Sequence, residues 1–195
     1  MTASILAALL LLAPITPETA RFTIRQDGKT IGTEEFTIRA RDKGYVAEGK
    51  TQLAGDPSSL TSRMELDENL NPVSYEYSHG LGKISIKIGK PTSEMTVGAR
   101  GAESSTEFRF PDGASILDTN FFHHYLLLLY RAKGADQKIS VFVPQEMQAG
   151  QARIRSTGNR SFALEVGDVK LDATVDSAGR LMRLAVPSAK VVVER

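Results

Sequence analysis

Short segments in which apolar and polar residues alternate, separated by turn residues, follow one another along most of this 195-residue chain. The clearest is the segment from Lys83 to Ile88, in which three isoleucines alternate with two lysines and a serine. Successive side chains of a strand point to opposite faces of the sheet. The segment therefore predicts a strand with one buried and one solvated face.

Fourteen such segments predict a fold dominated by β-strands. The predicted strands are 21–25, 30–40, 45–53, 59–66, 73–78, 83–88, 94–99, 105–110, 138–143, 151–157, 161–166, 169–175, 181–186 and 190–194. Asp27-Gly28, between the first two, favours a tight hairpin because glycine adopts positive φ at no steric cost. So many short strands imply one large curved sheet, a sandwich or a barrel.

One segment has helical spacing instead, at about residues 119–132. Its apolar side chains recur at the spacing of a helix: Phe121, Phe122, Tyr125, Leu126, Leu128 and Leu129. Asp118 or Thr119 would cap the start of this helix by accepting a hydrogen bond from a free backbone N–H. Gly134 suits the position just beyond its end. The predicted fold is mainly β: a large curved antiparallel sheet or open half-barrel with one central hydrophobic helix.

The first residues predict export. Ile5–Ala13 is an apolar run ended by Pro14, shorter than the roughly 20 residues that span a bilayer. Its length is typical of the hydrophobic part of a signal peptide, although no lysine or arginine precedes it. We expect a signal peptide at residues 1–20, with cleavage after Ala20, and a single periplasmic or secreted domain at 21–195 without a transmembrane span. A buried N-terminal helix is the alternative.

Composition excludes several kinds of site. Lysine and arginine total 24 and aspartate and glutamate 23, and the basic residues are scattered, so the sequence carries no electrostatic signature of nucleic-acid binding. The chain has no cysteine, which excludes disulfides, thiol nucleophiles and cysteine-ligated metals. The glycine-rich phosphate loops and the GxSxG nucleophile motif are absent as well.

The remaining candidates for chemistry are histidines and carboxylates. His123-His124 are adjacent in the predicted helix and point about 100° apart, whereas metal-binding helices place ligands at i and i+4. A metal site made of His79, one of this pair and Asp118 is the alternative to histidines at the helix surface or near its cap. Glu34-Glu35 is expected to split across the sheet, since neighbours on a strand face opposite ways. We therefore predict no catalytic residue, no metal and no cofactor.

The helix gives the best indication of function. An apolar helix packed on the concave face of a curved sheet encloses either a solid core or a lipid-sized cavity. If a cavity is present, the residues expected to line it are Phe121, Phe122, Tyr125, Leu126 and Leu129.

Several segments carry a resemblance to known proteins. Residues 21–38, with Asp27-Gly28-Lys29-Thr30-Ile31-Gly32 and a return strand of x-G-x-E-x-F type, resemble the opening of bacterial secreted β-proteins of unknown function. Asp118 followed by 121–131 resembles their central helix, and 176–186 with 191–195 their closing hairpin. Such proteins are similar in outline to the half-barrel lipoprotein carriers of the LolA and LolB type. Those carriers have several helices, and LolB has an acylated cysteine, so no family binding residue is carried over.

These observations favour an exported, non-catalytic protein that binds an apolar or amphiphilic, lipid-like ligand in a half-barrel. A structural or protein-interaction module of the cell envelope with a solid core is the alternative, and a hydrolase is the third.

Overall fold

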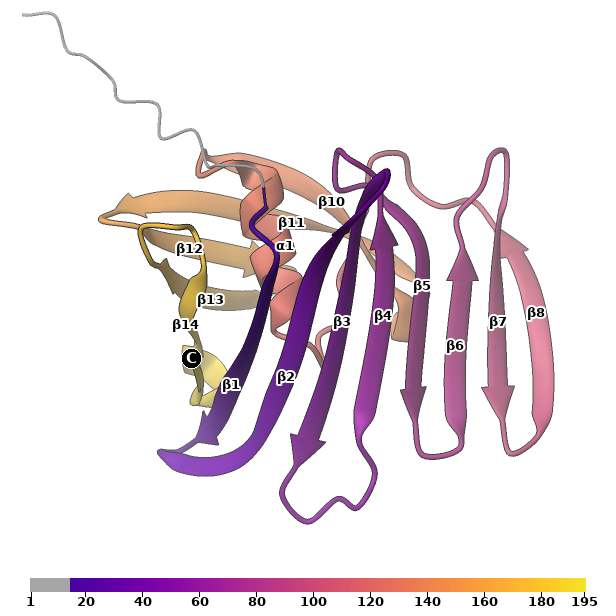
Figure 1. Ribbon diagram of the computed structural model, residues 1–195, viewed down its shortest axis with the longest axis horizontal. Coiled ribbons are helices and arrows are strands. Elements are labelled where there is room, and N and C mark those ends of the chain that lie inside the picture. Colours follow the sequence, from indigo (N-terminus) through magenta and orange to yellow (C-terminus); the bar gives the residue numbers. More distant parts are fainter. Residues whose placement is uncertain (1–14) are drawn as a thin grey trace, which may run out of the picture.

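The computed structural model describes residues 15–195 of the chain (Figure 1). The strands are β1 (Glu18–Gln26), β2 (Lys29–Arg41), β3 (Gly44–Leu53), β4 (Leu60–Leu66), β5 (Pro72–His79), β6 (Gly82–Lys87), β7 (Ser93–Ala99), β8 (Ala102–Phe108), β9 (Ser115–Ile116), β10 (Gln137–Val143), β11 (Gln148–Gly158), β12 (Ser161–Val166), β13 (Val169–Val175), β14 (Leu181–Val186) and β15 (Val191–Glu194). The α-helix is α1 (His123–Ala132), and two 3-10 turns follow β10 and β14, η1 (Pro144–Glu146) and η2 (Pro187–Ala189). Within residues 15–195, the prediction of a mainly β fold with a single helix is confirmed.

All fifteen strands belong to one open sheet, in the order β8-β7-β6-β5-β4-β3-β2-β1-β15-β14-β13-β12-β11-β10-β9. Two antiparallel meanders, β1–β8 and β10–β15, are joined where β1 pairs with β15. The exception to antiparallel pairing is β9, which runs parallel to β10. This two-residue strand is the one that the alternation pattern does not predict.

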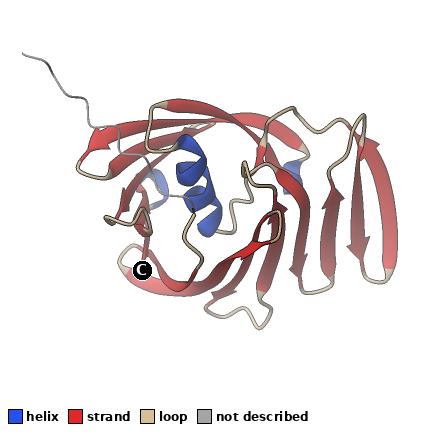
Figure 2. Ribbon diagram, turned by 45° about the horizontal axis from the view of Figure 1, so that its top comes forward, coloured by secondary structure: helices blue, strands red, loops and turns tan. Residues whose placement is uncertain are grey.

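The sheet curls around the helix. Figure 2 shows α1 lying inside the curved sheet, while β6, β7 and β8 project beyond the curled part. The turn at Asp27-Gly28 is formed as expected, with φ of 49° and 77°. These positive φ values match a tight turn that follows the twist of the two strands.

The faces of the strands follow the alternation. Ile86 is buried and Lys87 is exposed, as expected for neighbours on β6. The expected split of the acidic pair on β2 is also found: Glu34 is fully buried, whereas the side chain of Glu35 is 64% exposed. One face of β2 and of β6 therefore borders the interior, and the carboxyl group of Glu34 lies inside it.

The predicted signal segment Ile5–Ala13 lies outside the described residues. Cleavage after Ala20 would remove three residues of β1, which begins at Glu18. It would also remove the buried side chain of Ile15 from the core. Glu18 pairs with Arg195 at 2.6 Å, so the start and the end of the described chain are tied together.

The start of the helix differs from the expectation. Helix α1 begins at His123, not near residue 119, and its N-cap Phe122 offers no side-chain hydrogen bond. Asp118 and Thr119 therefore do not cap it. The carboxylate of Glu34 does so from β2, accepting hydrogen bonds from the N–H groups of Phe122 and His123. This group satisfies two of the backbone donors that a helix start leaves free.

Candidate functional site

A cleft of about 490 Å³ opens between the start of α1 and the strands β10–β13. Its apolar lining comes from Tyr125 on the helix and from four valines, Val141, Val143, Val166 and Val169. Ligand pockets of proteins typically have volumes of about 300–1,000 Å³ and mostly apolar walls. The cleft has the size and the lining of such a pocket.

Strand register explains why these valines meet. Val141 and Val143 are two residues apart on β10 and therefore share its inner face. Val166 and Val169 face each other as the last pair of the β12–β13 hairpin. Gly150 on β11 pairs with Val141, and a Cβ at Gly150 would lie 3.5 Å from a methyl group of that valine. The missing side chain at Gly150 keeps this part of the cleft open.

Polar residues also line the cleft, among them Glu146, Gln148 and Gln151. Arg153 on β11 and Glu165 on β12 belong to the lining as well and form an ion pair at 3.5 Å. All of these polar side chains are exposed or half-buried. The cleft thus combines apolar walls with polar groups that face water, which is the distribution that suits an amphiphilic molecule.

Of the five helix residues expected to line a cavity, the structure brings Tyr125 to this cleft. Phe121, Leu126 and Leu129 are buried in the core. Phe122 is half-buried and packs against the core. The helix therefore mainly fills the curved sheet, and the lining comes chiefly from strands.

A second feature lies at the start of α1, where four polar side chains are fully buried: Glu34, Asp118, His123 and His124. Glu34 accepts the N–H of Phe122 at 2.6 Å and the N–H of His123 at 3.1 Å. It also lies 2.6 Å from the ring nitrogen Nδ1 of His123. A buried carboxylate is costly unless it is paired, and here three donors surround it.

Asp118 is the centre of the other half of this cluster. Its carboxylate accepts the backbone N–H and the side-chain amide of Asn120, both at 2.9 Å. The Tyr75 hydroxyl and the Gln145 side-chain amide donate to its second oxygen. The N–H of Asp118 donates to Nδ1 of His124 at 3.0 Å, which places the proton of neutral His124 on Nε2. The cluster thereby links α1 to β5 and to η1.

Burial governs the acid–base behaviour of this cluster. It lowers the pKa of His124 well below its usual value, and the neighbouring His123 lowers this pKa further. Burial also raises the pKa of the Tyr75 hydroxyl, and the charge of Asp118 adds to that increase. The pKa of Tyr125 is raised to about 12, again mainly by burial. His124 is therefore neutral and both tyrosines are protonated at neutral pH.

A histidine whose Nδ1 faces a carboxylate is an arrangement used for general bases. Here Nε2 of His123 is buried and has no hydrogen-bond partner in the described part of the chain. Ser62, which pairs with Gly49 beside the His123 ring, has an equally buried and unpartnered hydroxyl. Neither atom is open to a substrate, so the arrangement supports a structural role.

No local sequence pattern predicts this cluster. The ring of His123 fits because Gly49 lacks a side chain: a Cβ there would lie 2.8 Å from Nδ1 and closer still to Cε1. The expected alternative metal site does not form, since His79 contacts Asp56 at 3.1 Å on the surface. Within residues 15–195, no group of three histidine or acidic side chains is placed to hold a metal ion.

A larger hollow of about 1,370 Å³ lies between the β4–β5 loop, the β6–β7 loop and residues 109–114. Its charged side chains are mostly exposed and pair with one another, as Lys90 does with Asp112 at 3.8 Å. This hollow has four charged residues in its lining, against three in the cleft beside α1, and it lacks the valine wall of that cleft.

No helix in the described region is long and apolar enough to cross a membrane. Comparison of the chain with protein-family models, with curated proteins and with solved structures finds no match.

Proposed function

We propose that this chain is an exported, non-catalytic protein that binds an apolar or amphiphilic, lipid-like ligand in the cleft between α1 and β10–β13. The observation that carries the proposal is the lining itself, which combines four valines and Tyr125 with three charged residues that are exposed or half-buried. Burying an apolar chain against such a wall contributes about 25 cal/mol for each Å² removed from water.

The lining also favours binding over catalysis. Its charged residues are Glu146, Arg153 and Glu165, and the last two are already paired with each other. The buried histidines lie elsewhere, at the packed start of α1. A ligand in the cleft would therefore meet apolar side chains together with exposed polar groups.

A structural or protein-interaction module of the cell envelope is the second candidate. The observation in its favour is that Phe121, just before the helix, and Leu126 and Leu129, on the helix, are buried among the core residues. In that case the cleft would hold only water.

A titration with a fluorescent fatty acid separates the two candidates. Gly150→Leu places a side chain in the cleft beside Val141, where a Cβ has ordinary contact distance. Ser140→Leu adds the same side chain to the exposed face of β10 and is the matched control. We expect the wild type and the control to bind the probe, and Gly150→Leu to bind about tenfold more weakly or worse, a change of 1.4 kcal/mol. A wild type that binds no probe, or equal binding by all three proteins, would remove the proposal.

The exported location is tested separately. It rests on the apolar segment Ile5–Ala13, and we expect protein from the native host to lack this segment. N-terminal sequencing that finds residues before Pro14 intact would contradict export by a cleaved signal peptide. A mature chain that still contains Glu18 would retain the ion pair with Arg195.

A further inference from the structure

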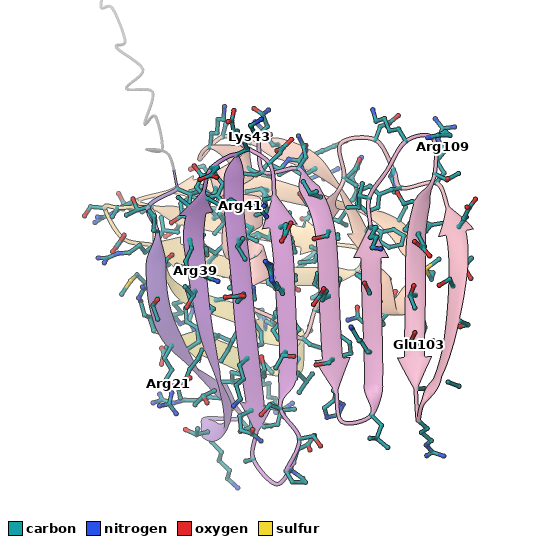
Figure 3. All side chains as sticks on the ribbon, turned by 45° about the vertical axis from the view of Figure 1, so that its right-hand side comes forward. Arg21, Arg39, Arg41, Lys43, Glu103 and Arg109 are labelled. Atoms are coloured by element: carbon teal, nitrogen blue, oxygen red, sulfur yellow. The ribbon has the colours of Figure 1, made fainter. Side chains whose placement is uncertain are left out.

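The two edges of the sheet are very different. One edge is β9, with two residues that are both buried. The other is β8, with seven residues, of which Ala102–Glu107 are all exposed. Figure 3 shows this end of the sheet, with Glu103 labelled. A long, exposed edge strand offers unpaired backbone N–H and C=O groups to an added strand. Strand β8 is therefore the longer edge at which the sheet can be extended.

The outer face shows which charges an added strand would meet. Across β2–β4, positive and negative side chains alternate and pair, as Glu48 does with Arg39 at 2.5 Å and with Arg63 at 3.7 Å. Across β6–β8, Lys87, Glu94 and Glu107 form one row.

A second row on the outer face is Lys83, Gly98 and Glu103. Both rows begin with lysine on β6 and end with glutamate on β8. Within residues 15–195, neither Glu103 nor Glu107 has an ion-pair partner within 4.0 Å. The next position in each row, beyond β8, would therefore favour a lysine or an arginine.

In the projecting part of the sheet, the inner face is apolar on β6 and β7 but not on the edge strand β8. Ile84, Val97 and Ser104 are neighbours across β6, β7 and β8. Val97 is 38% exposed, and nearby Leu81 in the β5–β6 turn is 76% exposed. On this face an added strand would border Ser104 and Thr106 of β8, and apolar side chains that reach over these two small residues would approach Val97.

A second copy of this chain fits the edge poorly. Full antiparallel pairing of β8 with itself, centred on Ser105, places Glu103 opposite Glu107 twice. Like charges placed directly opposite each other destabilise a strand pair. The edge therefore disfavours self-association while it remains open to a strand of opposite charge.

We propose that β8 is the docking site for an extended segment of a partner protein, which adds to the sheet as an antiparallel strand. This segment carries basic residues opposite Glu103 and Glu107 and apolar residues on the inner face. Main-chain hydrogen bonds supply affinity, and the two charge pairs select the register.

The test uses a capped, fluorescently labelled peptide, Thr-Lys-Val-Thr-Val-Lys-Thr, and its counterpart in which both lysines are glutamates. Paired with β8 in antiparallel register, the two lysines lie opposite Glu107 and Glu103. We expect the wild type to bind the lysine peptide and not the glutamate peptide, with affinity falling as salt increases. In the double variant Glu103→Lys with Glu107→Lys, the preference should reverse, with a change of about tenfold or more for each peptide.

Both exchanged residues are exposed, so the variant should keep the fold, and circular dichroism and the melting temperature check this. A second control, Arg39→Glu, changes an equally exposed charge on β2, away from the edge, and should leave peptide binding unchanged. Absence of binding to the wild type, or a preference that the double variant does not reverse, would overturn the proposal.

Discussion

The curled part of the sheet and the projecting strands β6–β8 are both made of short antiparallel hairpins, but their inner faces are covered to different extents. In the curled part, α1 fills the inner face, and its first turn is held by the buried carboxylate of Glu34 on β2 and by the N–H of Asp118, which donates to His124. In the projection, the inner face is buried at Ile86 and becomes partly exposed at Val97. The comparison shows that alternation along a strand specifies which face is apolar, whereas covering that face needs a further element.

The largest loss of stability is expected at Ile86 on β6, the strand of the projection in which the inner face is still buried. Ile86→Asp would bury an unpaired charge and lower the free energy of unfolding by about 4 kcal/mol or more. Ile84→Asp, on the same face of β6 but half-buried, should cost less than half as much. Lys87→Asp, on the exposed face, should change stability least. Urea denaturation midpoints of the three variants give the ranking, and equal midpoints would mean that the projection has no buried face.

The next effect concerns the anchor of the helix. Glu34→Ala leaves two buried backbone N–H groups and the His123 ring without their acceptor, and each buried group left unsatisfied costs about 1–3 kcal/mol. Glu35→Ala removes the neighbouring, exposed carboxylate, whose ion pair with Arg21 at 3.8 Å is worth about 0–1 kcal/mol. Similar unfolding free energies for the two variants would show that Glu34 does not hold the helix.

Two glycines, Gly49 in the curled part and Gly98 in the projection, allow the tightness of packing in the two parts to be compared. At Gly49 an added methyl group would collide with the His123 ring, whereas at Gly98 on β7 the nearest atom would lie 3.5 Å away. Gly49→Ala should therefore cost about 1–3 kcal/mol, and Gly98→Ala should be neutral or slightly stabilising. The cost at Gly49 should shrink in a His123→Ala background. If it stays the same in that double-mutant cycle, the contact with His123 is not its cause.

The smallest effect is a dependence on pH. Because burial lowers the pKa of His124, the unfolded chain takes up a proton near its ordinary pKa of about 6.5 while the folded chain does not. The stability is therefore complete above this pH and declines below it, by at most about 1.4 kcal/mol per pH unit. Between pH 7 and 5, the unfolding free energy of the wild type should fall more steeply with decreasing pH than that of His124→Gln. Parallel curves would contradict a neutral, buried His124.

The features that the sequence predicted correctly are those that depend on neighbouring residues in the chain. The alternation at Lys83–Ile88 and the Asp27-Gly28 turn depend on neighbours in the chain, and both are found. Strand β9 is too short to show any alternation. The start of α1 depends on Glu34, which is 88 residues from Phe122, so no local capping pattern could reveal it.

The candidate site was predictable only in part. Its valines lie in predicted strands, but their meeting depends on the curvature of the sheet and on the missing side chain at Gly150. The helix face that the periodicity singled out is apolar because it fills the core, and only Tyr125 reaches the cleft. Periodicity shows that a face is buried and does not distinguish a core from the wall of a cavity.

The most direct test of the ligand-binding account is native mass spectrometry of the protein after gentle purification from its native host, with Gly150→Leu prepared in the same way. We expect the wild type to carry the added mass of a lipid or a similar amphiphile, and we expect this mass to be absent or much reduced in the variant. A wild type that has only the mass of its polypeptide, and that also fails to take up added fatty acid, would contradict it.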